Sequence, residues 1–164
     1  MTATMTLGEK LLFGSSGNAV RFLGRGWDEL GSDDGRWSVD HVAEFLFELS
    51  PPPQGDMTLD IEMLPFVHAP QLVRQSVEIY INGLWAGFFS ARSPVTASTT
   101  IRSEMLRMRG TNVLSFVFPD ACSSIELGIG KDPRSFGFNF QSLSLNSRVP
   151  ATKFSSGAVK FASR

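Results

Sequence analysis

The sequence predicts an all-β fold, an antiparallel β-sandwich of the jelly-roll kind with at most one short helix. Apolar and polar residues alternate with period two in several short segments, which is typical of strands that bury one face. Glycine and proline separate these segments, and the chain has 15 Gly and 9 Pro among its 164 residues. Many short strands joined by such turns indicate a sandwich or a barrel.

The expected strands follow one another along the chain with turn residues between them. The segments that alternate or otherwise resemble strands are residues 45–49, 59–63, 77–81, 112–118 and 136–145. Asn82-Gly83 follows the third of these segments and is the strongest short signal for a β-hairpin, which places Trp85 on the returning strand. Residues 101–109 are the best window for a helix, but they lack a sustained apolar stripe and allow one short helix at most.

Length and composition bound the domain organisation and the classes of partner. We expect one sandwich domain over residues 1–147, followed by residues 148–164, which carry four basic residues and no acid. This end is interpreted as a solvated tail or an added strand, and the alternative is a basic arm that contacts an acidic partner or a membrane surface. A net charge of −1 gives no positive field for a polyanion, so nucleic acid is not expected as a partner.

Targeting signals are not evident in the sequence. The first eight residues lack the basic start and apolar run of a secretory signal, so cytoplasmic residence is the expectation. No stretch approaches the length of about 20 apolar residues that a membrane span needs. The single cysteine, Cys122, rules out an internal disulfide framework.

The chain offers little catalytic chemistry, and we expect no enzyme activity and no cofactor. Its two histidines, His41 and His68, are isolated, and no serine or cysteine stands in a nucleophile motif. Two isolated histidines also do not supply a metal site. The acidic loop with Glu29, Asp33 and Asp34 is interpreted as solvated, with a calcium site or a pair of catalytic carboxylates as weaker alternatives.

Two glycine-rich signatures near opposite ends of the chain combine tryptophan, acids and arginine. Their candidate site residues are Trp27, Glu29, Arg36 and Trp37 in the first, and Asp132 and Arg134 in the second. In a structural interpretation the tryptophans cap one end of the sandwich, while Arg36 or Arg134 pairs with Glu29 or Asp132. In a functional interpretation a tryptophan stacks on a sugar ring and the polar residues bind its hydroxyls.

Trp85 is an independent candidate for ligand binding. It follows the tight Asn82-Gly83 turn, where a large ring can stay exposed, although it could equally pack over the adjacent strand. The bias toward phenylalanine, with 14 Phe against 1 Tyr, indicates that most other aromatic mass fills the core.

The motifs in their order resemble a bacterial galactose-binding-like domain found beside or fused to glycosyltransferases. The resemblance covers residues 11–146 and rests on the following segments: Leu12-Phe13-Gly14, Phe22-Leu23, Gly26-Trp27, Gly35-Arg36-Trp37-Ser38, residues 77–83, residues 124–128, and residues 132–145. The family has an acid at a fairly regular position between the two tryptophans of the first signature. In this sequence both Glu29 and Asp33 could correspond to it.

This resemblance implies a jelly roll without activity of its own, associated with the biosynthesis of bacterial surface polysaccharide. The leading interpretation is therefore a non-catalytic, carbohydrate-binding-like accessory module whose partners are a glycan and a glycosyltransferase or another protein. The alternative is an assembly protein that binds a protein partner through a sheet face or edge and recognises no sugar.

Overall fold

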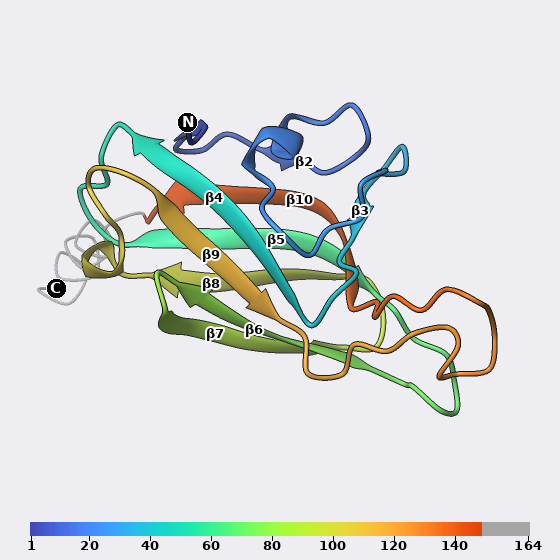
Figure 1. Ribbon diagram of the computed structural model, residues 1–164. Coiled ribbons are helices and arrows are strands. Elements are labelled where there is room, and N and C mark those ends of the chain that lie inside the picture. Colours follow the sequence, from blue (N-terminus) through green and yellow to red (C-terminus); the bar gives the residue numbers. More distant parts are fainter. Residues whose placement is uncertain (149–164) are drawn as a thin grey trace, which may run out of the picture.

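The computed structural model of the protein describes residues 1–148, which form two β-sheets packed face to face (Figure 1). The first sheet contains, in spatial order, β1 (Thr4–Thr6), β4 (Val42–Ser50), β9 (Asn112–Val117), β6 (Gln75–Ile81) and β7 (Leu84–Ala91). The second sheet contains β2 (Leu11–Leu12), β10 (Phe138–Ser147), β5 (Met57–Pro65) and β8 (Val95–Ile101), and β3 (Arg36–Trp37) pairs with β10.

Alternating side chains fill the space between the two sheets. In β4, Phe45 and Phe47 are fully buried, whereas the intervening residues are only partly covered. In β5, Leu59 and Ile61 face the same core, which β10 completes with further phenylalanines. Burial of these faces is the main source of stability for a sandwich, because the apolar surface leaves water on both inner faces.

The hairpin between β6 and β7 turns at Asn82 and Gly83, which both have positive φ angles, of 50° and 82°. The Asn82 side chain also stabilises the turn: it donates to the carbonyl of Met105 at 2.9 Å and accepts from the amide of Val113 at 2.9 Å. The expected type of turn is thus present, because positive φ at both central residues defines type I′.

The fold class predicted from the sequence is confirmed, and so are the expected strands. The structure adds strands that the sequence did not indicate, namely β8 and the short β1, β2 and β3. Strand β1 pairs with β4 in parallel, which departs from a purely antiparallel sandwich.

The helical content is slightly larger than expected but contains no α-helix in the described residues. A 3₁₀ turn, η2 (Ser103–Met105), occupies the window that the sequence marked, and a second, η1 (Asn18–Phe22), was not expected. Among residues 1–148, no helix is long and apolar enough to cross a bilayer. Apart from Arg148, the predicted C-terminal tail or added strand lies outside the described residues.

Candidate functional site

A groove of about 550 Å³ lies at the open edge of the sandwich, where β7 of the first sheet meets β8 of the second. The two strands follow each other in the chain and end their respective sheets on the same side (Figure 1). Aromatic residues of β7 form one part of the groove and hydroxyl residues of β8 and β5 form the other. The lining residues are Thr58, Trp85, Ala86, Gly87, Phe88, Phe89, Ser98, Thr99 and Thr100.

The turn and a bulge together bring Trp85 to the surface. The register between β6 and β7 shifts between Ile79 and Tyr80, so that Tyr80 lies opposite Trp85. The Trp85 side chain is 60% exposed and that of Phe88 is 51% exposed. A bulge re-aims the side chains around it, and the sandwich therefore presents two large aromatic rings to solvent beside the groove.

Small residues let the two sheet edges approach each other below these rings. The Thr99 hydroxyl donates to the carbonyl of Ala86 at 2.7 Å and links β8 to β7. A Cβ atom added at Gly87 would lie 2.8 Å from Oγ1 of Thr99, so the close approach requires glycine there. The Thr99 side chain thus fixes the wall of the groove by its contacts with the backbone of β7.

A hydrogen-bonded pair, Tyr80 and Glu78, lies beside the exposed rings. The Tyr80 hydroxyl donates to Oε2 of Glu78 at 2.9 Å, and this bond, with smaller effects of burial and charge, raises the pKa of Tyr80. Tyr80 and Glu78 are opposite Trp85 and Phe88 in the register, so the four side chains share one region of the sheet. Aromatic faces next to fixed hydroxyl and carboxylate groups can bind a polyhydroxylated ligand.

Trp27 of the first signature lies in the core. Its side chain is 8% exposed, and its ring centroid is 4.9 Å from that of Phe140 and 5.4 Å from that of Phe13. The indole N–H donates to the carbonyl of Glu44 at 2.8 Å. The Trp27 ring is thus packed against other rings and its N–H is hydrogen-bonded. Trp27 therefore has a structural role and presents no open face to a ligand.

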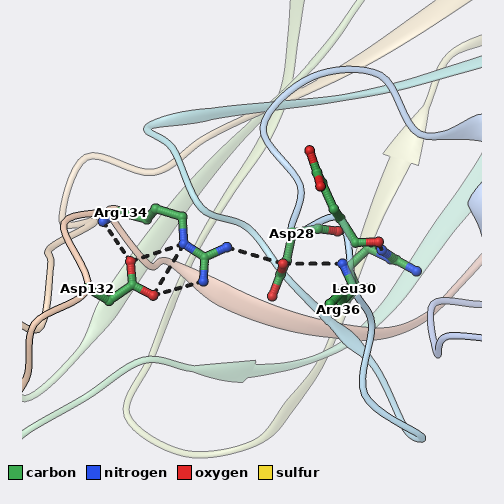
Figure 2. A network of polar contacts seen from close by, with 6 residues as sticks. Asp28, Leu30, Arg36, Asp132 and Arg134 are labelled. Atoms are coloured by element: carbon green, nitrogen blue, oxygen red, sulfur yellow. Dashed lines mark hydrogen bonds and ion pairs between the residues drawn. The ribbon is translucent and has the colours of Figure 1, made fainter.

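Arg134 joins the two signatures at the loop end of the sandwich, as Figure 2 shows. Its guanidinium donates to both carboxylate oxygens of Asp132, at distances from 2.8 to 3.2 Å, and to Oδ1 of Asp28 at 3.1 Å. The acid of the first signature that pairs with Arg134 is Asp28, and neither Glu29 nor Asp33 makes this contact. Hydrogen bonding from Arg134 lowers the pKa of Asp132 below its ordinary value.

Arg36 is 4% exposed and is held by backbone carbonyls. Its Nη1 donates to the carbonyl of Asp28 at 2.6 Å and to that of Glu29 at 2.9 Å, and its Nε has no hydrogen-bond partner. The expected pairing of Arg36 with a carboxylate is thus replaced by carbonyl contacts, because its own loop wraps around the guanidinium. Glu29 contributes only its backbone to this contact, and its side chain is exposed.

Trp37 packs edge-on against two phenylalanines at the same end of the molecule. Its ring centroid is 5.9 Å from that of Phe66 and 5.8 Å from that of Phe136, at near-perpendicular angles. The Arg134 guanidinium lies over Phe136, 5.3 Å from the centroid. These contacts join three loops from distant parts of the chain, so the two signatures form a clasp at this end.

The clasp is expected to give a defined pH dependence of stability. Because the folded pKa of Asp132 lies below its ordinary value of 3.8, the contact stabilises the protein above that pH, and this contribution is lost as pH falls through the folded pKa. Thermal unfolding of wild type and Arg134→Ala should therefore differ most near neutrality and converge in acid. When both proteins also carry Asp132→Asn, the difference between their melting temperatures should depend less on pH. A difference between wild type and Arg134→Ala that stays constant with pH would contradict this role.

The acidic loop does not form a metal site in the described residues. Asp33 and Asp34 are exposed, and within residues 1–148 no three His, Cys, Asp or Glu side chains gather closely enough to hold an ion. The same two aspartates line a second hollow with Gly14, Ser16 and Gln141.

The structure thus separates Trp85 from the other candidate site residues. Trp27, Glu29, Arg36, Trp37, Asp132 and Arg134 belong to the core or the clasp. Sequence reasoning missed the hydroxyl residues of β8, which line the same groove as Trp85. The only available signal was the Thr and Ser content of residues 96–100, which lacks the apolar alternation of an obvious strand.

Comparison with known proteins identifies the fold. No protein-family model matches the chain, and a search of curated proteins also finds no match. A family 6 carbohydrate-binding module is similar in structure, with a TM-score of 0.51, 11% identity, and coverage of 90% of this chain and 100% of that chain. The chain therefore has the jelly-roll β-sandwich fold of that module.

Two larger proteins contain similar domains. A family GH115 4-O-methyl-α-glucuronidase with specificity for decorated arabinogalactans gives a TM-score of 0.52 at 10% identity over 91% of this chain and 19% of its own length. The mosquito-larvicidal Cry4Aa toxin of Bacillus thuringiensis gives 0.51 at 10% identity over 90% of this chain and 25% of its own. At these identities the similarity establishes the fold, which hosts different functions.

Proposed function

We propose that this protein is a non-catalytic carbohydrate-binding module that holds a glycan in the groove beside Trp85. The observation that carries the proposal is the position of the 60% exposed indole of Trp85 at a groove of about 550 Å³ lined with hydroxyl groups. The fold, which is similar to that of a family 6 carbohydrate-binding module, supports the same function.

The chemistry of the groove suits a sugar. One face of a pyranose ring carries C–H groups that pack on an indole, while its hydroxyls need fixed donors and acceptors. Trp85 and Phe88 supply the apolar surface, and Ser98 and Thr100 supply exposed hydroxyls close by. An indole has only two rotatable side-chain bonds, so Trp85 loses little conformational entropy on binding, which lowers the entropic cost of association.

Replacing Trp85 with alanine should weaken glycan binding strongly while changing stability little. Truncation of a central aromatic residue in a binding site typically costs about 2 kcal/mol or more, which is roughly a thirtyfold weaker affinity. Leu84→Ala is the matched control, because Leu84 is also on β7 and 51% exposed but does not line the groove. A glycan array followed by calorimetry of the three proteins measures this; equal affinity of wild type and Trp85→Ala would refute the proposal.

The biological setting that we propose is the biosynthesis of bacterial surface glycans, with a glycosyltransferase as the protein partner. The support is the resemblance of the motifs in residues 11–146 to domains found with such enzymes. In this setting the module works in the cytoplasm and holds the growing glycan near the enzyme. Co-elution with glycosyltransferases encoded beside it tests the setting, and independent elution from all of them would argue against it.

A second candidate function is assembly through strand β7. Over its eight residues, Leu84–Ala91, this edge strand carries no charge, and it exposes Leu84, Trp85 and Phe88. Uncharged apolar edge strands are suited to pairing with another protein. Light scattering over a concentration series separates the two functions: in the assembly account both Leu84→Ala and Trp85→Ala reduce association, whereas in the glycan account the protein does not self-associate through β7.

A further inference from the structure

Two further hollows lie along the second sheet beyond the Trp85 groove. One, of about 160 Å³, is lined by Glu62, Met63, Pro94, Val95, Thr96 and Gln141. The other, of about 270 Å³, is lined by Leu12, Gly14, Ser16, Gly17, Asp33, Asp34 and Gln141. The Trp85 groove and the first of these share strand β8, and the two hollows share Gln141, so the three follow one another across the sheet.

The outer face of the second sheet between these hollows is polar throughout. The register of β8, β5 and β10 sets three rows of three outward residues, and paired residues in neighbouring strands share a face. The rows are Thr100, Thr58 and Asn146; Ser98, Asp60 and Ser144; and Thr96, Glu62 and Ser142. All nine side chains carry oxygen, and eight of them reach solvent, because Ser142 is only 4% exposed. The eight exposed or half-buried side chains can donate and accept hydrogen bonds along the face.

A bulge in β10 places Gln141 between the two smaller hollows. The register with β5 shifts between Phe140 and Ser142, and Gln141 is the extra residue. Its backbone carbonyl accepts from the amide of Phe13 at 3.1 Å, which fixes the strand, and the residue lines both hollows. The bulge thus presents an amide group where a ligand crossing the face would pass.

The charge of the lining residues restricts the ligand. Glu62, Asp33 and Asp34 are the charged residues among those that line the three hollows, and no lysine or arginine is among them. Lys10 contacts Glu62 at 3.1 Å and offsets one of these charges. Carboxylates or phosphates on a ligand would be repelled there, whereas neutral or amino groups would not.

The geometry points to an extended glycan chain as the ligand: we infer that a neutral or amino-bearing polysaccharide runs from Trp85 across the polar face of the second sheet, past Gln141, toward Asp33 and Asp34. This inference rests on the proposed function and names its substrate class. The four residue intervals from Thr58 to Glu62 alone span about 13 Å, so the whole track accommodates several consecutive sugar units rather than a single chain end.

The test begins with affinity electrophoresis of the protein in hydroxyethyl cellulose, xylan, laminarin, glycol chitosan and polygalacturonate. We expect retardation by at least one neutral or amino-bearing polymer and none by polygalacturonate. Calorimetry then compares two-unit and six-unit oligosaccharides of the polymer that binds. The six-unit ligand should bind at least about fivefold more tightly, as one additional hydrogen bond of ordinary net strength would give.

Gln141→Ala separates the track from the Trp85 groove. This variant should weaken six-unit binding by about fivefold, leave two-unit binding unchanged, and melt like wild type, since the Gln141 side chain makes no hydrogen bond within residues 1–148. Gln71→Ala is the matched control, because Gln71 is an exposed glutamine in the loop after β5, away from the hollows. Equal affinity for two and six units, or preference for polygalacturonate, would overturn the track and leave the Trp85 site intact. Absence of binding to every polymer would overturn the proposed function itself.

Discussion

Replacing Trp27 with alanine is expected to lower the free energy of unfolding by about 3–5 kcal/mol. The Trp27 ring packs between the sheets against Phe13, Phe116 and Phe140, with centroid distances from 4.9 to 6.2 Å. Alanine would leave a cavity among these rings, and the neighbours can collapse only in part because strands hold them. The bond from the indole N–H to the carbonyl of Glu44 would be lost as well.

Chemical denaturation of Trp27→Ala measures this loss, with Trp85→Ala as the control. Both variants remove the same side chain, but Trp85 is 60% exposed and Trp27 is 8% exposed. Trp85→Ala should therefore change the free energy of unfolding by less than about 1 kcal/mol, as is usual for surface substitutions. Similar losses in the two variants would contradict the separation of core and surface tryptophans.

Replacing Gly26 with alanine should lower the free energy of unfolding by about 2–5 kcal/mol, from two additive causes. Gly26 has a φ of 89°, and a side chain costs about 1–2 kcal/mol in that region. An added Cβ would also lie 2.1 Å from the carbonyl oxygen of Val42 and 2.7 Å from Cα of Ala43. Since both atoms belong to the backbone of β4, the strand must move, and overpacking of this kind costs a further 1–3 kcal/mol, roughly.

Gly83→Ala isolates the first cause. Gly83 has a φ of 82°, and nothing lies within 4 Å of its added Cβ. Gly83→Ala should therefore lower the free energy of unfolding only by the cost of the positive φ angle, about 1–2 kcal/mol. Denaturant midpoints of the two variants give the comparison, and equal losses would mean that β4 does not approach Gly26 as closely as the structure shows.

The sequence predicted the fold where a local pattern carried the information. Period-two alternation located β4 and β5, and the Asn82-Gly83 turn located the β6–β7 hairpin with Trp85 on its returning strand. Strand β8 was not predicted because its apolar alternation is weak: Ala97 and Ile101 are the only buried residues of this strand. The short strands β1, β2 and β3 are specified by their partners rather than by their own residues.

The candidate site was predictable only in part, because its two walls come from strands whose proximity depends on the tertiary fold. Trp85 could be singled out from the hairpin, but its hydroxyl neighbours Ser98 and Thr100 could not. The clasp shows the same limit, since Asp28 was not among the expected partners of Arg134. Asp28 and Arg134 are 106 residues apart in the sequence, so their contact depends on how the loops meet in the fold. The spacing of neighbouring residues cannot indicate it.

The most direct test of the central claim, that the groove beside Trp85 binds glycan, uses the indole ¹H–¹⁵N resonances of the three tryptophans during titration with a binding oligosaccharide. The account predicts that the Trp85 signal shifts with ligand concentration, while that of Trp27, whose N–H is bonded to the carbonyl of Glu44 in the core, stays in place. Movement of the Trp37 signal with a static Trp85 signal would place the site at the clasp instead and contradict the account.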